Sequence, residues 1–442
     1  MKFVSLLGAG LIAASVWAGA AGAAQFPGPY DSTIWDLAKA KPAGSHVGMV
    51  GAVGEESAAF RVFKFRPDGS RYKAFGGRGF AAPFEKGMNP AQGEGVAIGR
   101  DGSIVAVGYR LPEQDQALAN YRAALIAKLR PSGSLQRRFG HGGVVKTKLR
   151  SRGGEIYRDV DIDGKGRIVV VGSVNEALWH DRAALVRMYS SRGELVRGFG
   201  KGGTVRVARD GHSGRSDFDE VEVLPSGKIL VSGFLSGRPV VVRLTAAGKL
   251  DHGFGRRGIV ASKANPDLPC NLTCRSRTAL DVNANGRITL VSAPWNRNLV
   301  IERFAPSGAR IKSFGRRGVA TVSPARLVPA ARSVPGYRRI ASVALGGAAV
   351  TKSGAITIAG TVAIEAKGSD DRRSSVLIAL NRRGDLARSF GKRGALIDTK
   401  HLSTAATSIL AQGERGVLVG GAIHKVDPET GPDLVTLRRF RR

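Results

Sequence analysis

Cysteine is almost absent from this sequence of 442 residues, which has only Cys270 and Cys274. A chain so poor in cysteine cannot depend on a disulfide network, which excludes the small disulfide-rich folds. In an oxidising compartment two cysteines this close are expected to form a local disulfide, which adds little stability because the loop it closes is short. Half of a metal site is the alternative, but no histidine or further cysteine stands near the pair.

Long apolar runs are also missing, except at the N-terminus. No other stretch approaches the roughly 18 uncharged apolar residues of a membrane-spanning helix, so we expect no transmembrane segment. At the N-terminus, Lys2 precedes a short apolar run over 3–16, and small residues at 21–24 fit a cleavage site. This pattern is typical of a signal peptide, which we expect over 1–24. The protein is therefore expected to be secreted or periplasmic.

Acidic residues are scarce relative to basic ones, with 35 Asp and Glu against 68 Lys and Arg and a formal net charge of +33. Such a charge attracts anionic polymers and surfaces, although it says nothing about the fold. Aromatic residues make up 6% of the chain, and basic surfaces without interleaved aromatics are poor platforms for single-stranded nucleic acid. An anionic polysaccharide, lipopolysaccharide or a protein is therefore the expected partner of a monomeric protein, with nucleic acid a weaker candidate.

Motifs for catalysis are absent as well. The seven histidines are scattered without the His-x-x-x-His spacing of zinc ligands, and there is no Gly-x-Ser-x-Gly and no Walker loop. Asp159-Val160-Asp161-Ile162-Asp163-Gly164 resembles the start of a calcium loop, but the twelfth position, which requires Glu, is Val170. A strand leading into a turn fits this segment better. We expect no catalytic residue, no metal and no cofactor.

Glycine, by contrast, is abundant, and much of it follows a repeated pattern. The dipeptide Phe-Gly, with another Gly three positions after its own, begins at Phe75, Phe139, Phe199, Phe254, Phe314 and Phe390. Successive copies are separated by 55 to 76 residues. An internal repeat of this length is typical of a solenoid, a propeller or an array.

Each period reads as a set of short strands. In one period, alternating residues at 221–223 precede the turn Pro225-Ser226-Gly227, a β-branched run follows, and a further alternating segment at 240–244 leads to a turn at Gly248. Alternation between glycine turns predicts about four antiparallel strands, and no period has a convincing helix pattern. A sheet of four strands cannot bury both faces alone, so radial stacking into an all-β, β-propeller fold is expected.

The number of blades follows from the best-preserved strand pair, which occurs seven times. Seven blades are therefore predicted, with six and eight left open. Only six copies carry Phe-Gly, so the first and last units are incomplete. Residues 25–45 are a candidate for a strand that closes the ring, through Thr33-Ile34-Trp35, and the propeller is expected over 46–442.

The repeats resemble the bacterial delta-60 repeat, a family of β-propellers of unknown function. The matching residues run from Gly227-Lys228-Ile229-Leu230-Val231-Ser232-Gly233 through Val242-Arg243-Leu244 and Gly248-Lys249-Leu250 to Phe254-Gly255-Arg256-Arg257-Gly258-Ile259. The family's usual turn stands at Pro67-Asp68-Gly69. The resemblance covers nearly the whole mature chain. It implies a propeller and an exported location, and it supplies no catalytic residues.

The sequence departs from the family beside each Phe-Gly. The family has Asp three positions before the Phe, and here only Asp251 keeps the acid, while the next position is basic or His in every copy. With basic residues that follow Phe-Gly, these positions give a candidate anion-binding set: Lys73, Arg137, Arg197, Lys201, Arg256, Arg257, Lys312, Arg316, Arg317, Arg388, Lys392 and Arg393. Equivalent positions of a propeller form a ring, so the set predicts an anion-binding circle. A set of merely solvated turns is the alternative.

Two more repeated positions are charged. The acidic position holds Asp161, Glu222 and Asp281, and the basic position holds Lys64, Lys128, Arg243 and Arg303. An ion pair within each blade is one interpretation. A carboxylate-lined channel is the other, and it would support a propeller hydrolase or lyase that uses central carboxylates and a metal, the alternative to a non-enzymatic binding role.

Variable loops offer a rival surface. They lie at 109–122, 262–278, 322–340 and 362–374, and strand direction places them at the end of each sheet opposite the tight turns. Insertions gathered on one face of a repeat protein often form its binding face. A protein partner would be expected there.

Overall fold

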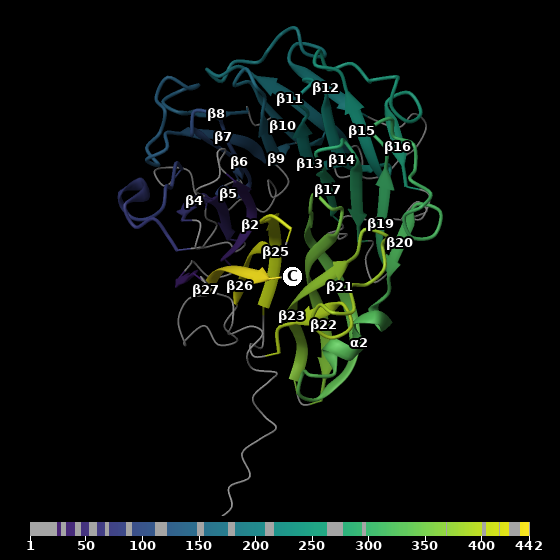
Figure 1. Cartoon of the computed structure of the whole chain (residues 1–442). Helices are drawn as coiled ribbons and strands as arrows, with labels where there is room; N and C mark the ends of the chain where they lie inside the picture. The colour runs from purple at the N-terminus through teal and green to yellow at the C-terminus, as the bar shows by residue number, and fades with distance from the viewer. Residues whose placement is uncertain are drawn as a thin grey trace, which may run out of the picture.

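Seven antiparallel sheets surround a central axis in the computed structural model (Figure 1). In the described residues six sheets have four strands and one has three, which confirms the all-β propeller and its seven blades. The structure describes residues 24–27, 32–39, 46–52, 60–66, 70–84, 91–110, 122–147, 154–175, 182–207, 216–262, 277–293, 298–367, 369–399, 404–414, 416–423 and 434–441.

The blades are numbered here in chain order. Blade 1 consists of β2 (Ser32–Lys39), β3 (His46–Ala52) and β4 (Phe60–Phe65), followed by the 3-10 helix η1 (Phe75–Gly77). Blades 2 and 3 consist of β5 (Ala91–Ile98), β6 (Ile104–Arg110), β7 (Ala123–Leu129), β8 (Val144–Lys146), β9 (Glu155–Ile162), β10 (Ile168–Asn175), β11 (Arg182–Tyr189) and β12 (Thr204–Val207). Blades 4 and 5 consist of β13 (Asp217–Val223), β14 (Ile229–Leu235), β15 (Arg238–Leu244), β16 (Ile259–Ala261), β17 (Thr278–Val282), β18 (Ile288–Ser292), β19 (Leu299–Phe304) and β20 (Val319–Val322). Blades 6 and 7 consist of β21 (Tyr337–Val350), β22 (Ile356–Ala366), β23 (Ser369–Leu380), β24 (Ala395–Ile397), β25 (Thr404–Ala411), β26 (Gly416–Ile423), β27 (Leu434–Arg441) and β1 (Ala24–Pro27).

The middle strands are apolar on both faces because a neighbouring blade covers each face. Every residue of β7 is buried, and so is every residue of β14. The innermost strands differ, since one of their edges borders the axis. In β9, four of the five residues from Arg158 onward are half-buried, and Val160 is buried.

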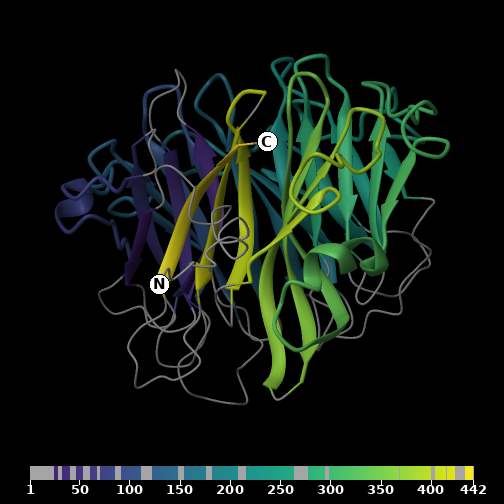
Figure 2. The ribbon, with the colours of Figure 1, turned by 60° about the horizontal axis from the view of Figure 1, so that its bottom comes forward.

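Both tight turns of a blade lie at one end of the propeller, which we call the turn face (Figure 2). The strand ends that border the longer connections lie at the opposite end, the loop face. Gly166 and Gly227 end the first turns of blades 3 and 4 with φ of 75° and 78°. This left-handed conformation favours glycine, which explains why the turns of the repeat end in Gly.

The ring is closed by the N-terminal strand. β1 pairs antiparallel with β27, so that Ala24 lies opposite Leu437, and it supplies the outermost strand of blade 7. The candidate Thr33-Ile34-Trp35 lies instead in β2, the innermost strand of blade 1, where Thr33 pairs with Gly51 of β3. β2 therefore belongs to the first sheet although it precedes the boundary expected at residue 46.

Phenylalanines of the Phe-Gly repeats are buried between blades. Their exposure ranges from 0% at Phe254 to 8% at Phe390. Phe199 shares one apolar cluster with Val186 of its own blade and with Val231 and Val242 of the next blade. The ring of Phe199 is therefore a wedge between two blades.

Among the described residues one α-helix interrupts the β pattern, in the variable loop between blades 5 and 6. α2 (Pro324–Ala331) begins with a proline, buries Leu327 and Ala331, and packs beside β21. The paired strands β21 and β22 extend beyond the other blades at the loop face (Figure 2). The absence of a convincing helix pattern made the helix unexpected. In the described part of the chain no helix has the length and apolarity needed to cross a membrane.

Candidate functional site

The Phe-Gly turns are the five residues from each Phe to the Gly four positions later. In blade 4, the N–H of Gly258 donates to the carbonyl of Phe254 (2.8 Å), which closes the turn on itself. Gly255 and Gly258 take left-handed φ of 52° and 92°. Arg256 and Arg257 stand between these glycines, at the tip of the turn.

Each of five such turns is fastened to the next blade by a main-chain hydrogen bond. The N–H of Gly255 donates to Ser307 O (2.9 Å), and that of Gly315 donates to Arg383 O (2.7 Å). Gly76, Gly140 and Gly200 make the same contact with the blades that follow them. These bonds fix the spacing of the turns around the rim.

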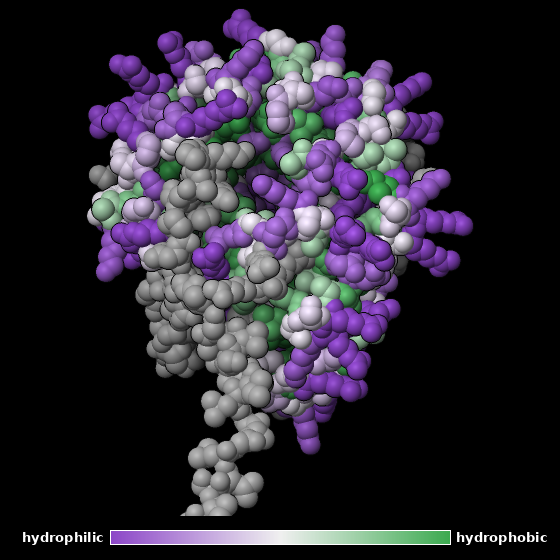
Figure 3. All heavy atoms as spheres, viewed as in Figure 1, coloured by the Kyte–Doolittle hydropathy of each residue, from purple (hydrophilic) through white to green (hydrophobic). Residues whose placement is uncertain are grey.

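All twelve predicted anion-binding residues are exposed, and the turns that carry them lie on the turn face. Figure 3 shows hydrophilic side chains radiating around the rim of this face. In the described part of the chain none of the twelve forms an ion pair with a carboxylate, and Lys392 donates a hydrogen bond to Ser333 Oγ (2.5 Å). The turns bring Arg256 and Arg257 together, and likewise the basic pairs of blades 5 and 6, but the whole set is distributed around the rim.

The basic position on the third strands has a structural role. Lys128 donates to Ser191 O of the next blade (3.3 Å), and Lys64 donates to Pro131 O (3.2 Å). Arg303 donates to Gly354 O (2.8 Å) and Arg382 O (3.2 Å) and lies over the Phe314 ring at 4.6 Å from its centroid. Arg243 makes the equivalent contact with Pro306 O. These cations bind carbonyl groups of the next blade, and Arg243 also pairs with Asp251 of its own blade (2.7 Å between Nε and Oδ2). An ion pair with the acidic position of the same blade stays a prediction.

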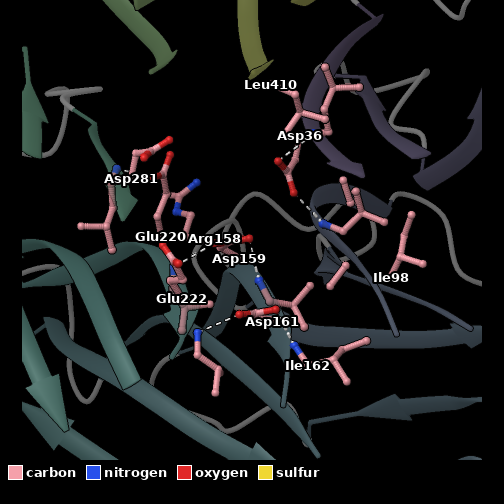
Figure 4. Close-up of a pocket in the computed structure, with 18 of the residues that line it drawn as sticks. Asp36, Ile98, Arg158, Asp159, Asp161, Ile162, Glu220, Glu222, Asp281 and Leu410 are labelled. Carbon is pink, nitrogen blue, oxygen red and sulfur yellow. Dashed lines mark hydrogen bonds between the residues drawn. The ribbon is translucent and has the colours of Figure 1, made fainter. Parts of the chain in front are cut away.

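A cavity of about 820 Å³ lies on the axis, lined by innermost strands. Six of these strands contain a β-bulge or similar shift of register, at residues 35, 94, 158, 219, 346 and 407. A bulge re-aims the side chains that follow it. Directly after three bulges stand Asp36, Asp159 and Glu220, which Figure 4 shows directed toward the cavity.

These three carboxylates also join neighbouring blades. Asp36 accepts a hydrogen bond from the N–H of Val96 in the next blade (2.8 Å). In the same way, Asp159 accepts one from Val221 (2.8 Å), and Glu220 accepts one from Leu280 (2.5 Å). The acidic position identified in the sequence lies two residues further along these strands. There Asp161 accepts a hydrogen bond from the N–H of Val223 (2.7 Å), and Asp281 accepts one from the N–H of Val350 (3.0 Å). Asp161, Glu222 and Asp281 line the channel, as the second interpretation of this position expected.

Burial makes the carboxyl groups of the channel hard to ionise. It raises the pKa of Glu220 from 4.5 to about 8 and that of Asp281 from 3.8 to about 6. Burial also raises the pKa of Asp36, and it raises that of Asp159 well above its ordinary value, helped by the negative charges of Asp36 and Glu220. Carboxyl groups of this kind can exchange protons near neutral pH.

Toward the loop face, arginines neutralise the channel acids. Glu94 is buried and accepts from Arg158 (3.3 Å) and Arg277 (2.9 Å). Arg158 also lies 3.6 Å from the carboxylate of Asp217, and the buried acids around it raise its pKa despite desolvation. This network was not predicted, because the bulges that place Glu94 and Arg158 break the alternation of their strands.

A metal site is not evident in the residues that the structure describes, where no three His, Cys, Asp or Glu side chains are placed to hold an ion. The segment that resembles a calcium loop is a strand and a turn, as expected. Asp163 bonds the N–H of Lys165 (2.9 Å) and pairs with Arg167 (2.6 Å between Oδ2 and Nε). Cys270 and Cys274 lie outside the described residues, as does most of the loop around them.

Comparison with known proteins supports the fold and leaves the activity open. Residues 224–254 match the model of a β-propeller domain of unknown function. This match supports a propeller repeat family, although it does not single out the delta-60 repeat. No curated protein matches the chain in sequence.

Two solved structures illustrate the architectural likeness. A protein of unknown function from Dyadobacter fermentans is 9% identical, with 95% of this chain and 100% of that one covered and a TM-score of 0.43. The GH93 α-L-arabinofuranosidase of Fusarium graminearum is 8% identical, with 94% and 98% covered and a TM-score of 0.41. By the repeat at residues 224–254, the chain is similar to a β-propeller domain of unknown function.

Proposed function

We propose that this protein is an exported, non-enzymatic binding protein that holds acidic polysaccharides on its turn face. The observation that carries the proposal is the exposure of twelve basic side chains at repeated positions on one face. Within the described chain no carboxylate pairs with them, so their charge is available to a ligand. A linear polymer with regularly spaced anionic groups matches regularly spaced cations.

The character of the described surface favours a polysaccharide over nucleic acid or lipid. Leu195, with 38% of its surface exposed, is the one large apolar side chain exposed among the described residues. Base stacking requires accessible aromatic rings, and insertion into a membrane requires an accessible apolar edge. The described surface offers cations and hydrogen-bond donors instead, which are the groups that sulfates and carboxylates bind.

Binding to a panel of polymers tests the proposal. The mature protein would be titrated with heparin, polygalacturonate, neutral dextran, duplex DNA and anionic phospholipid vesicles. We expect salt-sensitive binding to the two acidic polysaccharides and none to dextran. Tighter binding to DNA or vesicles would replace the polysaccharide as ligand, and the absence of salt-sensitive binding to any polymer would refute an anion-binding function.

Matched charge variants locate the surface. Exchange of Arg197, Lys312 and Arg388 for Gln removes three charges from the turn face. Exchange of Arg338, Lys367 and Arg373 for Gln removes three exposed charges at the loop-face ends of β21, β22 and β23. We expect the turn-face variant to lose affinity and the loop-face variant to keep it. Equal losses would show that only net charge matters.

The exported location is part of the proposal and rests on the pattern of residues 1–24. Fractionation of expressing cells, followed by N-terminal sequencing, provides the test. The expected result is a mature chain outside the cytoplasm that begins near Ala24 or Gln25. Cytoplasmic protein with residues 1–24 intact would contradict it.

A hydrolase or lyase that works through the channel carboxylates is the second candidate. The raised pKa values of Asp36, Asp159 and Glu220 beside a cavity of about 820 Å³ favour it, because proton-transfer groups of enzymes are tuned in this way. Their hydrogen bonds to the next blade favour a structural role instead. Turnover of an acidic polysaccharide that disappears in Glu220→Gln, while the protein stays folded, would select the enzyme.

A further inference from the structure

The basic turns of three successive blades have an unusual backbone. Arg257, Arg317 and Arg393 take positive φ values of 51°, 54° and 55°. These residues occupy the same position of the Phe-Gly turn in blades 4, 5 and 6. Side chains other than glycine rarely adopt this left-handed conformation, because Cβ approaches the neighbouring carbonyl oxygen.

Glycine occupies this position in the two preceding blades. Gly142 and Gly202 have φ of 65° and 62°, so the turn keeps its shape with or without an arginine. A Cβ added to either glycine would meet no atom within 4 Å. The side chain at this position therefore leaves the turn into open space, and packing does not require an arginine there.

The main-chain hydrogen bonds of the turn hold this conformation, but they do not require an arginine side chain. The three arginines are exposed, and in the described chain no carboxylate pairs with them. A strained position occupied by a side chain that has no carboxylate partner points to a functional requirement for that side chain. At a surface site, that requirement is a ligand outside the chain.

The three turns are held at fixed spacing. The Gly255 bond to Ser307 O and the Gly315 bond to Arg383 O lock blade 4 to blade 5 and blade 5 to blade 6. Each turn presents two adjacent cations, with Arg256, Arg316 and Lys392 as the second members. Preorganised cations bind a spaced set of anions with little loss of conformational entropy, and guanidinium groups can bind sulfate or carboxylate through two hydrogen bonds.

We infer that these six residues form one continuous basic arc, in which Arg257, Arg317 and Arg393 determine specificity for an acidic polysaccharide that spans three blades. The inference rests on the proposed polysaccharide-binding function and assigns it to one part of the rim. The ligand class is a linear chain with sulfate or carboxylate groups at regular intervals. Blades 1–3 then add charge without selecting the ligand.

The test exchanges the three strained arginines for glycine, which the turn accepts in blades 2 and 3. The triple variant should bind long heparin chains about tenfold more weakly, because it loses three exposed ion pairs. Its substitutions are Arg257→Gly, Arg317→Gly and Arg393→Gly. Melting temperature should stay equal or rise, because glycine relieves the strain. A variant with Lys73, Arg137 and Arg197 changed to Gln loses the same charge from blades 1–3 and should lose less than about threefold in affinity.

Ligand length supplies a second readout. A heparin disaccharide cannot connect several turns, so its binding should be weak and should lose less affinity in the glycine variant than the binding of long chains does. The reciprocal variant, Gly142→Arg with Gly202→Arg, extends the arc to blades 2 and 3 and should strengthen binding of long chains.

The outcomes separate the arc from the general function. Equal losses in the two triple variants, or the same loss for disaccharide and long chain, would overturn the arc while leaving polysaccharide binding intact. Failure of the wild-type protein to bind any acidic polysaccharide would overturn both.

Discussion

A buried phenylalanine followed by a left-handed glycine joins each of five blades to the next. The ring fills the space between two sheets, and the glycine N–H bonds to the following blade. Gly200 is one example, since a Cβ there would lie 2.3 Å from Thr204 O. Both residues were predictable, because the pair recurs at a fixed place in the repeat and a buried ring between sheets explains the recurrence.

Truncation of one such ring should be costly. Phe199 is 1% exposed, so Phe199→Ala should lower the free energy of unfolding by roughly 3–5 kcal/mol, through lost burial and the cavity left behind. Urea-induced unfolding measures the change. Leu195→Ala, at a partly exposed position, should cost less than about 1 kcal/mol, and a loss this small at Phe199 would show that the ring is not a wedge.

The channel carboxyl groups should give the protein an acid-favoured component of stability. The folded-state pKa of Glu220 is raised from 4.5 to about 8, so between these values the folded chain binds more protons than the unfolded chain. The contribution of Glu220 is therefore complete below pH 4.5 and is lost as the pH rises through 8. Its slope is at most about 1.4 kcal/mol per pH unit.

Glu220→Gln removes this titration and keeps an oxygen that can accept the N–H of Leu280. The free energy of unfolding, measured at pH 5, 6.5 and 8, should fall less steeply in the variant than in the wild-type protein. Asp36, Asp219 and Arg277 act on the same group and remain in both proteins. Parallel pH profiles would show that Glu220 does not titrate in this range.

At the scale of strands and turns, the elements that recur in every repeat could be predicted from the sequence, and those that occur once could not. Strands and tight turns recur in every period, so their alternation and glycines were readable. That Asp36, Asp159 and Glu220 occupy one equivalent position beside the channel was not predicted, because a bulge precedes each residue and breaks the period of two. The ring-closing β1 and the helix α2 occur once each, so no second copy marked them.

The basic residues on the third strand of each blade illustrate why charge alone does not identify a binding site. Arg303 is 5% exposed and its guanidinium bonds carbonyl groups of the next blade, so Arg303→Met should lower the free energy of unfolding by about 1.5–3 kcal/mol. Arg316→Met, at an exposed turn, should change it by less than about 0.5 kcal/mol. Chemical denaturation compares the two. Equal effects would contradict the division into structural and binding cations.

Considered as a whole, the molecule combines a basic rim with an acidic axis. The axis acids accept main-chain N–H groups across blades and so help to hold the ring together, whereas the rim cations face solvent. A polyanion is attracted by the rim and repelled by any ionised acid of the channel, so it should lie along the turns.

Closure of the ring should determine the stability of the whole propeller. Removal of residues 1–27 deletes β1 and leaves β27 without its outer partner. This variant should melt at a lower temperature than a variant lacking residues 1–23, which keeps β1. Identical melting temperatures would mean that β1 does not contribute to closure.

The salt dependence of heparin binding tests the central claim most directly. The affinity of the mature protein would be measured across a range of salt concentrations, together with the turn-face and loop-face charge variants. If the basic turns hold the polymer, affinity should fall steeply with salt in the wild-type protein and the loop-face variant and less steeply in the turn-face variant, because fewer counterions are released. A flat profile in the wild-type protein, or the same slope in all three proteins, would contradict polysaccharide binding by the turn face.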